Sequence, residues 1–158
     1  MAADGMIANG IKIGYSAASP VSWNAIGQLL SVGGIKLTRA KIARTVHSTN
    51  IFNRYLPGMA DVADVALEIL QDPDEGTTHG AVQEALRALL TAGTTVWWRI
   101  EFPTDRVQTE YKPVEFQGFV TDFEISGGAP EDRQTFTVTV AFDGDSVSIG
   151  PAGATAIT

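Results

Sequence analysis

Residue types that carry acid–base chemistry are scarce in this chain, which contains two histidines, His47 and His79. Next to His47 stands Ser48, and Asp61 follows, so the residue types of a hydrolytic triad are present. A triad is assembled in space, however, and the sequence has no Gly-x-Ser-x-Gly turn to present the serine as a nucleophile. An acid–base role for His79, in the first turn of an expected helix, would need a positioned partner that the sequence does not offer. We therefore expect no catalytic residue and no enzymatic activity.

Acidic residues cluster at Asp72, Asp74 and Glu75, and such a cluster raises the question of a calcium site. The spacing lacks the further oxygen ligands and the closing Glu of an EF-hand loop. An acidic turn before a helix favours the helix dipole, which already explains the cluster. The paired glycines of "SVGGIKL" lack the spacing of a phosphate loop, and the chain has no cysteine for zinc or an iron–sulfur cluster. The sequence therefore predicts no metal and no cofactor.

Length and composition predict a single domain over residues 1–158. The chain is 44% hydrophobic, which suffices for one core. Its net charge of −7 argues against a surface that grips nucleic acid, because such surfaces neutralise phosphates with clustered Lys and Arg. The same charge is ordinary for solubility, and it also fits an acidic wall along which DNA slides without sticking. Asp4 stands where a signal peptide needs cations, and no stretch approaches the roughly 20 apolar residues of a membrane span. We therefore expect a protein without a membrane anchor, synthesised in the cytoplasm.

One helix and several strands are expected in the second half of the chain. Residues 77–93 predict a helix that ends at Gly93 and lies on a sheet. Its apolar stripe consists of Val82, Ala85, Leu86, Leu89 and Leu90. Residues 96–102 and 135–142 alternate apolar and polar side chains and predict strands. Within 114–125 the alternation changes phase at Gly118, which predicts a bulge or a strand buried on both sides.

The N-terminal part of the chain predicts two further strands and a long loop. Residues 21–32 and 35–46 have the pattern of strands, and we expect a tight turn at Gly33-Gly34 to join them as a hairpin. Residues 47–58 are too long and too aromatic for a simple connection, so we expect a functional loop there.

The stretch "YLPGMADVADVALEILQDPDE" fits either a helix or a strand. A helix would leave Val65 and Leu67 off its apolar stripe, so we expect a strand over residues 63–70. The element order is then β-β-β-α-β-β-β. This order predicts a mainly β (α+β) fold, an antiparallel β-sandwich or flattened barrel with one packed α-helix.

Apolar side chains exceed what one such core can bury. Trp97 and Trp98 are neighbours in a strand and face opposite sides, so one of them must cover a second layer, another subunit or solvent. The expected loop adds Ile51, Phe52, Tyr55 and Leu56. These residues either fold back on their own domain or contact another copy of the chain.

Four stretches resemble, in order, the tail tube proteins of long-tailed, siphovirus-like bacteriophages. They are "GYSAASPVSWNAIGQLLSVGGIKLTRAKI", "NRYLPGMADVADVALEILQDPDE", "AVQEALRALLTAGTTVWWRIEFP" and "FQGFVTDFEISGGAPEDRQTFTVTVAFDG". The last contains the F-x-G-F-V-T pattern of that family, and the order and spacing of all four carry the resemblance. The resemblance covers roughly Tyr15 to Gly144. It implies a core of about 15–144, with a flexible N-terminal segment, 1–14, and a flexible C-terminal tail, 145–158.

The resemblance also implies a function. Tail tube proteins form six-membered rings in which strands of neighbouring subunits line up into a continuous inner barrel. The rings stack into a tube that houses the tape-measure protein and later conducts the genomic double-stranded DNA without binding it tightly. The implied location is the virion tail, and the implied further partners are the tail terminator and tail-tip proteins.

Five residues are expected to make contacts between subunits: Ile51, Phe52, Arg54, Tyr55 and Trp97. Phe52 and Tyr55 would serve as aromatic anchors to the next ring, with Arg54 as a charged partner. Two other interpretations remain open. The tube of a contractile injection system shares the fold and the ring, and a monomeric β-sandwich that binds carbohydrate or another ligand would share the fold only.

Overall fold

The computed structural model describes residues 10–17, 22–27, 29–44, 52–71, 78–105, 107–125, 134–144 and 147–157. Within them the chain forms one helix and ten strands, and every strand pair is antiparallel. An eight-stranded sheet contains β1 (Lys12–Ser16), β2 (Asn24–Ala25), β3 (Leu29–Val32), β6 (Val65–Leu70), β7 (Val96–Pro103), β8 (Tyr111–Ile125), β9 (Thr135–Phe142) and β10 (Ser148–Ile149). A separate pair consists of β4 (Leu37–Ala43) and β5 (Tyr55–Val62), and the helix is α1 (Thr78–Ala92).

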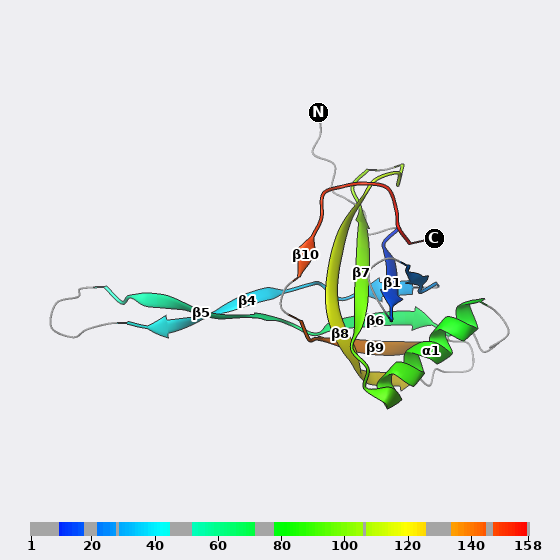
Figure 1. The fold of residues 1–158 in the computed structure, drawn as a ribbon, viewed down its shortest axis with the longest axis horizontal. Helices are drawn as coiled ribbons and strands as arrows, with labels where there is room; N and C mark the ends of the chain where they lie inside the picture. Colours follow the sequence, from blue (N-terminus) through cyan, green and yellow to red (C-terminus); the bar gives the residue numbers. More distant parts are fainter. Residues whose placement is uncertain are drawn as a thin grey trace.

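The expected mainly β fold with one helix is confirmed, although six strands were expected and the sheet is not closed into a barrel. The long strand β8 belongs to both halves of this sheet. Up to Gly118 it pairs with β7, and from Gly118 onward it pairs with β9. The first half-sheet therefore runs β2-β1-β7-β8, and the second half-sheet runs β8-β9-β6-β3. Figure 1 shows β7 and β8 upright, with β6 and β9 crossing them, so the two half-sheets meet at an angle.

The residue at the junction of the two half-sheets is Gly118. A glycine stands there because a side chain would have no room. A Cβ at this position would lie 2.5 Å from the carbonyl oxygen of Ala141. The indole Nε1 of Trp98 donates a hydrogen bond of 3.1 Å to the Gly118 carbonyl, which fixes the corner from inside the core. The close approach of two backbones is a common reason for glycine inside a strand.

The bulge in β8 does not fall at Gly118, and the expected position was wrong. Inward-facing residues continue to alternate through Gly118 to Val120, and the pairing register with β9 shifts between Val120 and Asp122. The extra residue reverses the phase, so that Phe123 turns inward and stacks on Phe136 with ring centroids 5.0 Å apart.

The core lies between the inner faces of both half-sheets, as the alternating patterns predict. Trp98 and Ile100 of β7, Leu67 of β6 and Val138 of β9 are fully buried. The strands expected at 63–70, 96–102 and 135–142 are confirmed, with boundaries that differ by a few residues at most. Burial of alternate side chains from facing strands gives one continuous hydrophobic cluster.

The expected helix is also confirmed. Leu86, in the middle of its apolar stripe, is fully buried in the core, while Glu84 and Arg87 form an exposed ion pair. Gly93 adopts a left-handed conformation with φ of 63°, and its amide donates to the Leu89 carbonyl at 3.0 Å, which ends the helix. No helix among the described residues has the length and apolarity that crossing a membrane requires.

The N-terminal strands pair differently from the sequence prediction. The stretch expected as one strand over 21–32 contains two short strands, β2 and β3, which lie at opposite ends of the sheet. No hairpin joins 21–32 to 35–46 at Gly33-Gly34, because β3 pairs with β6 whereas β4 pairs with β5. A pair of glycines indicates that the chain changes direction, but it does not specify which strands on either side of the turn pair with each other.

Both ends of the chain pack more extensively than the resemblance implies. Ile13, within the segment expected to be flexible at 1–14, is buried in β1 at the centre of the first half-sheet. Residues 147–157, within the tail expected to be flexible at 145–158, contain β10 and pack against β8 and β7. Ile157, near the end of the chain, is only 2% exposed.

Candidate assembly surfaces

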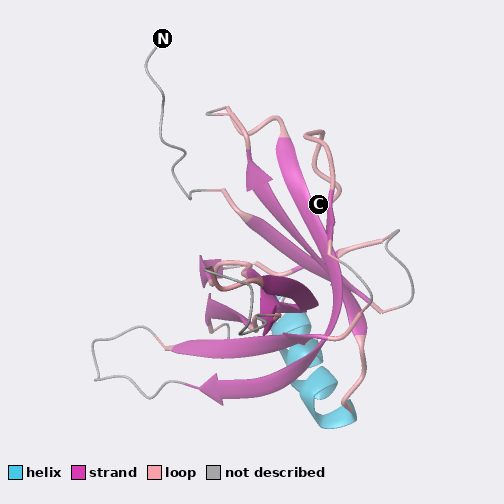
Figure 2. Ribbon diagram, turned by 90° about the vertical axis from the view of Figure 1, so that its left-hand side faces the viewer, coloured by secondary structure: helices cyan, strands magenta, loops and turns pink. Residues whose placement is uncertain are grey.

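A two-stranded hairpin projects from the sheet. We call residues 36–62 the arm, of which 36–44 and 52–62 are described. Figure 1 shows β4 and β5 extending together away from the rest of the molecule, and Figure 2 views the molecule from the side on which they project. All seven residues of β4 and six of the eight in β5 are exposed, so neither face of the hairpin is covered. A two-stranded hairpin without a covering layer is only marginally stable in water, and the arm therefore gains most from contact with another surface.

The arm concentrates exposed apolar side chains. Of the ten large hydrophobic residues that are exposed in the described part of the chain, six lie on it: Leu37, Ile42, Phe52, Tyr55, Leu56 and Met59. Phe52 is 81% exposed and Met59 is 86% exposed. Single exposed apolar residues are common on protein surfaces, but a group on one projecting element is typical of an interaction site.

The arm is also basic, in contrast to the rest of the chain. It contains five cations and one carboxylate, a charge of +4 with His47 neutral, whereas the remaining residues contain six cations and seventeen carboxylates, a charge of −11. Two of these cations make contacts within the arm. Arg39 donates to the Gly58 carbonyl at 2.8 Å, and Lys41 lies 5.0 Å from the centroid of the Tyr55 ring. The arm is thus complementary in charge to the body of another copy.

The arm carries four of the five residues expected at contacts between subunits. Phe52, Arg54 and Tyr55 are all exposed there, while Ile51 lies outside the described residues. Trp97 lies elsewhere, half-buried on the outer face of β7. No partner chain is present, so their role in contacts between subunits stays a prediction. The expected loop over 47–58 was partly wrong, because Tyr55 already begins β5 and pairs with Ala43 of β4.

The second half-sheet presents an acidic outer face. One row of paired residues runs across the four strands of this face. In order, the row contains Glu124 of β8, Thr137 of β9, Glu68 of β6 and Ser31 of β3. The Ser31 hydroxyl donates to the Glu68 carboxylate at 3.3 Å. Asp122 lies in the neighbouring row. Lys and Arg are absent from the described strand residues of this half-sheet, so the outer face, which we call the acidic face, carries negative charge alone.

The same half-sheet has two open edges. At one end, β3 pairs with β6 on one side, and no described strand pairs with its other side. At the other end, β8 beyond Gly118 pairs with β9, and again no described strand covers its second side. An exposed apolar side chain marks each edge, Leu30 on β3 and Ile125 on β8. Open edges are templates for pairing with another chain, so a four-stranded unit with two of them can be extended by further copies.

Few of the groups considered for chemistry belong to the described part of the chain. His47, Ser48 and the acidic cluster at 72–75 lie outside the described residues. Among the residues that the structure describes, no group of three or more His, Asp or Glu side chains could hold a metal ion. The surfaces that stand out are the arm, the acidic face and the open edges.

The fold is one that solved tail and tube assemblies share. The chain is similar to a chain in the tail of an empty gene transfer agent particle, solved with six-fold symmetry, with a TM-score of 0.64, 14% identity and 89% of this chain and 94% of that chain covered. It is similar to a chain of the SPP1 tail tube, with a TM-score of 0.64, 11% identity and coverages of 92% and 80%. A chain in the structure of a sheath/tube terminator of an extracellular contractile injection system gives a TM-score of 0.70, 14% identity and coverages of 95% and 100%. No family model and no curated protein matches the sequence. At these identities the likeness concerns the fold, and at that level the resemblance to tail tube proteins is confirmed.

The sequence did not predict the arm as a structural element, nor where the acidic face and the open edges lie. The basic residues between 36 and 54 were a readable signal, since they contrast with the acidic remainder of the chain. The face and the edges could not be read, because they depend on which strands become neighbours.

Proposed function

We propose that this chain is a structural subunit, without enzymatic activity, that assembles into stacked hexameric rings and forms the tail tube of a phage-like particle. The observation that carries the proposal is the second half-sheet, with its two open edges and its acidic outer face. The six-fold symmetry of the gene transfer agent tail, in which a similar chain occurs, supports the number of subunits.

Ring closure follows from the two open edges. The β3 edge of one copy would pair with the β8 edge of the next, so that each copy adds four strands to a continuous barrel. The acidic face would then line the lumen. The carboxylates on this wall repel phosphate, so double-stranded DNA would pass without tight binding. The tape-measure protein would occupy the same lumen before DNA, and tail terminator and tail-tip proteins would close the two ends.

The arm supplies the contact between subunits outside the barrel. Its basic and apolar surface fits the acidic body of a neighbouring copy, with Phe52 and Tyr55 as anchors and Arg54 as a charged partner. Trp97, half-buried on the outer face of β7, would be covered by a neighbour at a second contact, and Ile51 would extend the apolar surface of the arm.

Electron microscopy of concentrated protein tests the proposal. The wild-type chain is expected to form rings or tubes, and Leu30→Lys or Ile125→Lys, each at one open edge, is expected to abolish them because a buried lysine opposes strand pairing. Val107→Lys is the matched control, since Val107 is 79% exposed and lies in the β7–β8 turn, away from both edges. Rings that persist in the edge variants, or featureless monomers of the wild type at every concentration, would contradict the proposal. Featureless monomers would favour a binding module.

A terminator of a contractile injection system is the second candidate, because a chain in such a structure is similar over nearly its full length. A terminator ring closes the tube and does not stack further. The same micrographs distinguish the two functions, since a tube subunit gives stacks of varying length and a terminator gives single rings.

A further inference from the structure

The C-terminal segment closes a third strand edge of the molecule. We call residues 147–157 the strap. Its β10 pairs with β8, the Gly150 amide donates to the Pro113 carbonyl at 3.0 Å, and Gly153 and Tyr111 exchange two backbone hydrogen bonds of 3.0 and 2.7 Å. These bonds cover the edge of β8 that belongs to the first half-sheet, which no other described strand covers. Without the strap this edge would be as open as the other two.

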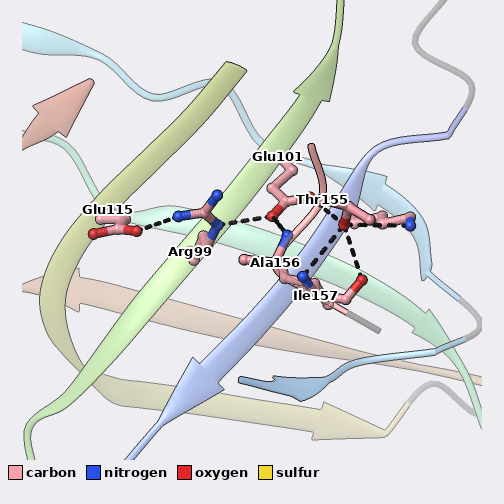
Figure 3. A network of polar contacts seen from close by, with 7 residues as sticks. Arg99, Glu101, Glu115, Thr155, Ala156 and Ile157 are labelled. Carbon is pink, nitrogen blue, oxygen red and sulfur yellow. Dashed lines mark hydrogen bonds and ion pairs between the residues drawn. The ribbon is translucent and has the colours of Figure 1, made fainter. Parts of the chain in front are cut away.

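The strap then crosses the outer face of β7, where a buried carboxylate binds it. Glu101 is fully buried and accepts hydrogen bonds from the Thr155 hydroxyl at 2.6 Å, the Ala156 amide at 2.9 Å and Arg99 Nε at 2.7 Å (Figure 3). Arg99 also pairs with Glu115 of β8. The carboxylate therefore connects two strands of the sheet to the strap.

Hydrogen bonds and the charge of Arg99 keep Glu101 ionised. Burial by itself raises the pKa of Glu101, but the hydrogen bonds from Thr155, Ala156 and Arg99, together with the Arg99 charge, outweigh burial and lower the pKa below its ordinary value. From β1, Lys12 approaches Thr155 with its Nζ 3.4 Å from the hydroxyl. An ionised carboxylate accepts hydrogen bonds more strongly than a neutral one, so the strap depends on this charge.

Apolar contact holds the strap at its first and last residues: Val147 packs, partly buried, against the hydrophobic core, and Ile157 is buried. Within residues 147–157, Ile157 is the one buried hydrophobic side chain; it packs over Gly14, and a Cβ on Gly14 would lie 3.4 Å from its Cδ1. Ile149 is 54% exposed, and most other strap residues are small. Between these two apolar contacts the strap is attached through directional polar bonds, and a peripheral segment of this kind can undock without opening the rest of the core.

We infer that the edge of β8 under the strap is a docking site for the strap of a second copy, with Glu101 as the residue that binds it. Each copy carries both the segment and its site, so an exchanged strap recovers every bond that it makes in its own molecule. This interface differs from the two ring-closing edges and does not depend on the proposed tube, since two copies suffice.

Disulfide trapping tests the exchange, and the chain has no cysteine of its own to interfere. Ser148 of the strap pairs directly with Glu115 of β8, within the separation that a disulfide spans. A full-length Ser148→Cys chain mixed with a full-length Glu115→Cys chain is expected to give a covalent heterodimer under mild oxidation. The control is the same strap variant mixed with Glu84→Cys, an exposed helix position. A yield about tenfold above the control supports exchange, and a yield equal to the control overturns it.

Hydrogen exchange tests the role of Glu101. In Glu101→Gln, the amides of Gly150, Gly153 and Ala156 are expected to exchange at least about tenfold faster than in the wild type, while the amides of α1 stay protected. Thr155→Val, which removes one donor and keeps the side-chain shape, is expected to act in the same direction. Glu84→Gln is the matched control. Unchanged strap exchange in both variants would overturn the assignment of Glu101, and loss of protection throughout the chain in Glu101→Gln leaves Thr155→Val to decide it.

Discussion

The bend of β8 leads to a prediction about one methyl group. Gly118→Ala places a Cβ 2.5 Å from the Ala141 carbonyl oxygen and 3.0 Å from Val140 Cγ1, and the first of these contacts is with backbone, which cannot rotate away. Overpacking of this kind costs about 1–3 kcal/mol. Alanine would offset roughly 0.5–1 kcal/mol of this loss, because glycine loses more conformational freedom on folding. The net expectation is a loss of unfolding free energy of about 0–2.5 kcal/mol, centred on about 1 kcal/mol, estimated from these two opposing effects.

Gly34→Ala is the matched control, because a Cβ there meets nothing within 4 Å and the backbone is not left-handed. This variant is expected to be neutral or to gain about 0.4–1 kcal/mol. Urea unfolding followed by the fluorescence of the tryptophans, of which Trp98 is fully buried beside Gly118, measures both variants under monomeric conditions. A Gly118→Ala midpoint that rises as much as the Gly34→Ala midpoint, with an unchanged slope, would refute the steric account of the bend.

Two further predictions concern charge. Because the pKa of Glu101 is lowered in the folded protein, its contribution to stability is complete above the unfolded pKa of about 4.3 and is lost as the pH falls through the folded value. Acid should therefore loosen the strap below about pH 4. In Glu101→Gln, hydrogen exchange of the strap amides should no longer speed up as the pH falls through this range. An identical acid response in the variant and the wild type would contradict the role of the Glu101 charge. The basic arm should make self-association sensitive to salt. We expect the double variant Arg39→Glu/Lys41→Glu to associate more weakly than the wild type at low ionic strength. We also expect association of the wild type to weaken as the salt concentration rises to about 0.5 M. Sedimentation measures both effects, Arg87→Glu on the exposed helix face is the control, and salt-independent association would count against an electrostatic arm contact.

The sequence determined the elements whose signals are local. Alternation over 135–142 and 96–102 requires one buried face, and the stripe through Leu86 with Gly93 after it requires a helix of that length, so these predictions were confirmed. The spacing of apolar residues and the residues that end a helix or strand can be read within a short segment. They do not depend on what packs against that segment. The class of fold followed from the order of these elements.

Tertiary structure alone decided which strands pair and which polar residues are buried. Alternation places Glu101 on the side away from the core, yet Thr155 and Ala156 cover it from more than fifty residues away. Gly33-Gly34 signals a turn, but β3 and β4 go to different partners because hydrogen bonds between strands are set by distant segments. The arm, the open edges and the strap all arise from such long-range pairing. Nearly every residue offers the same backbone N–H donor and C=O acceptor, so these groups do not encode which strands pair. Their hydrogen-bond partners are decided only when the whole chain is folded.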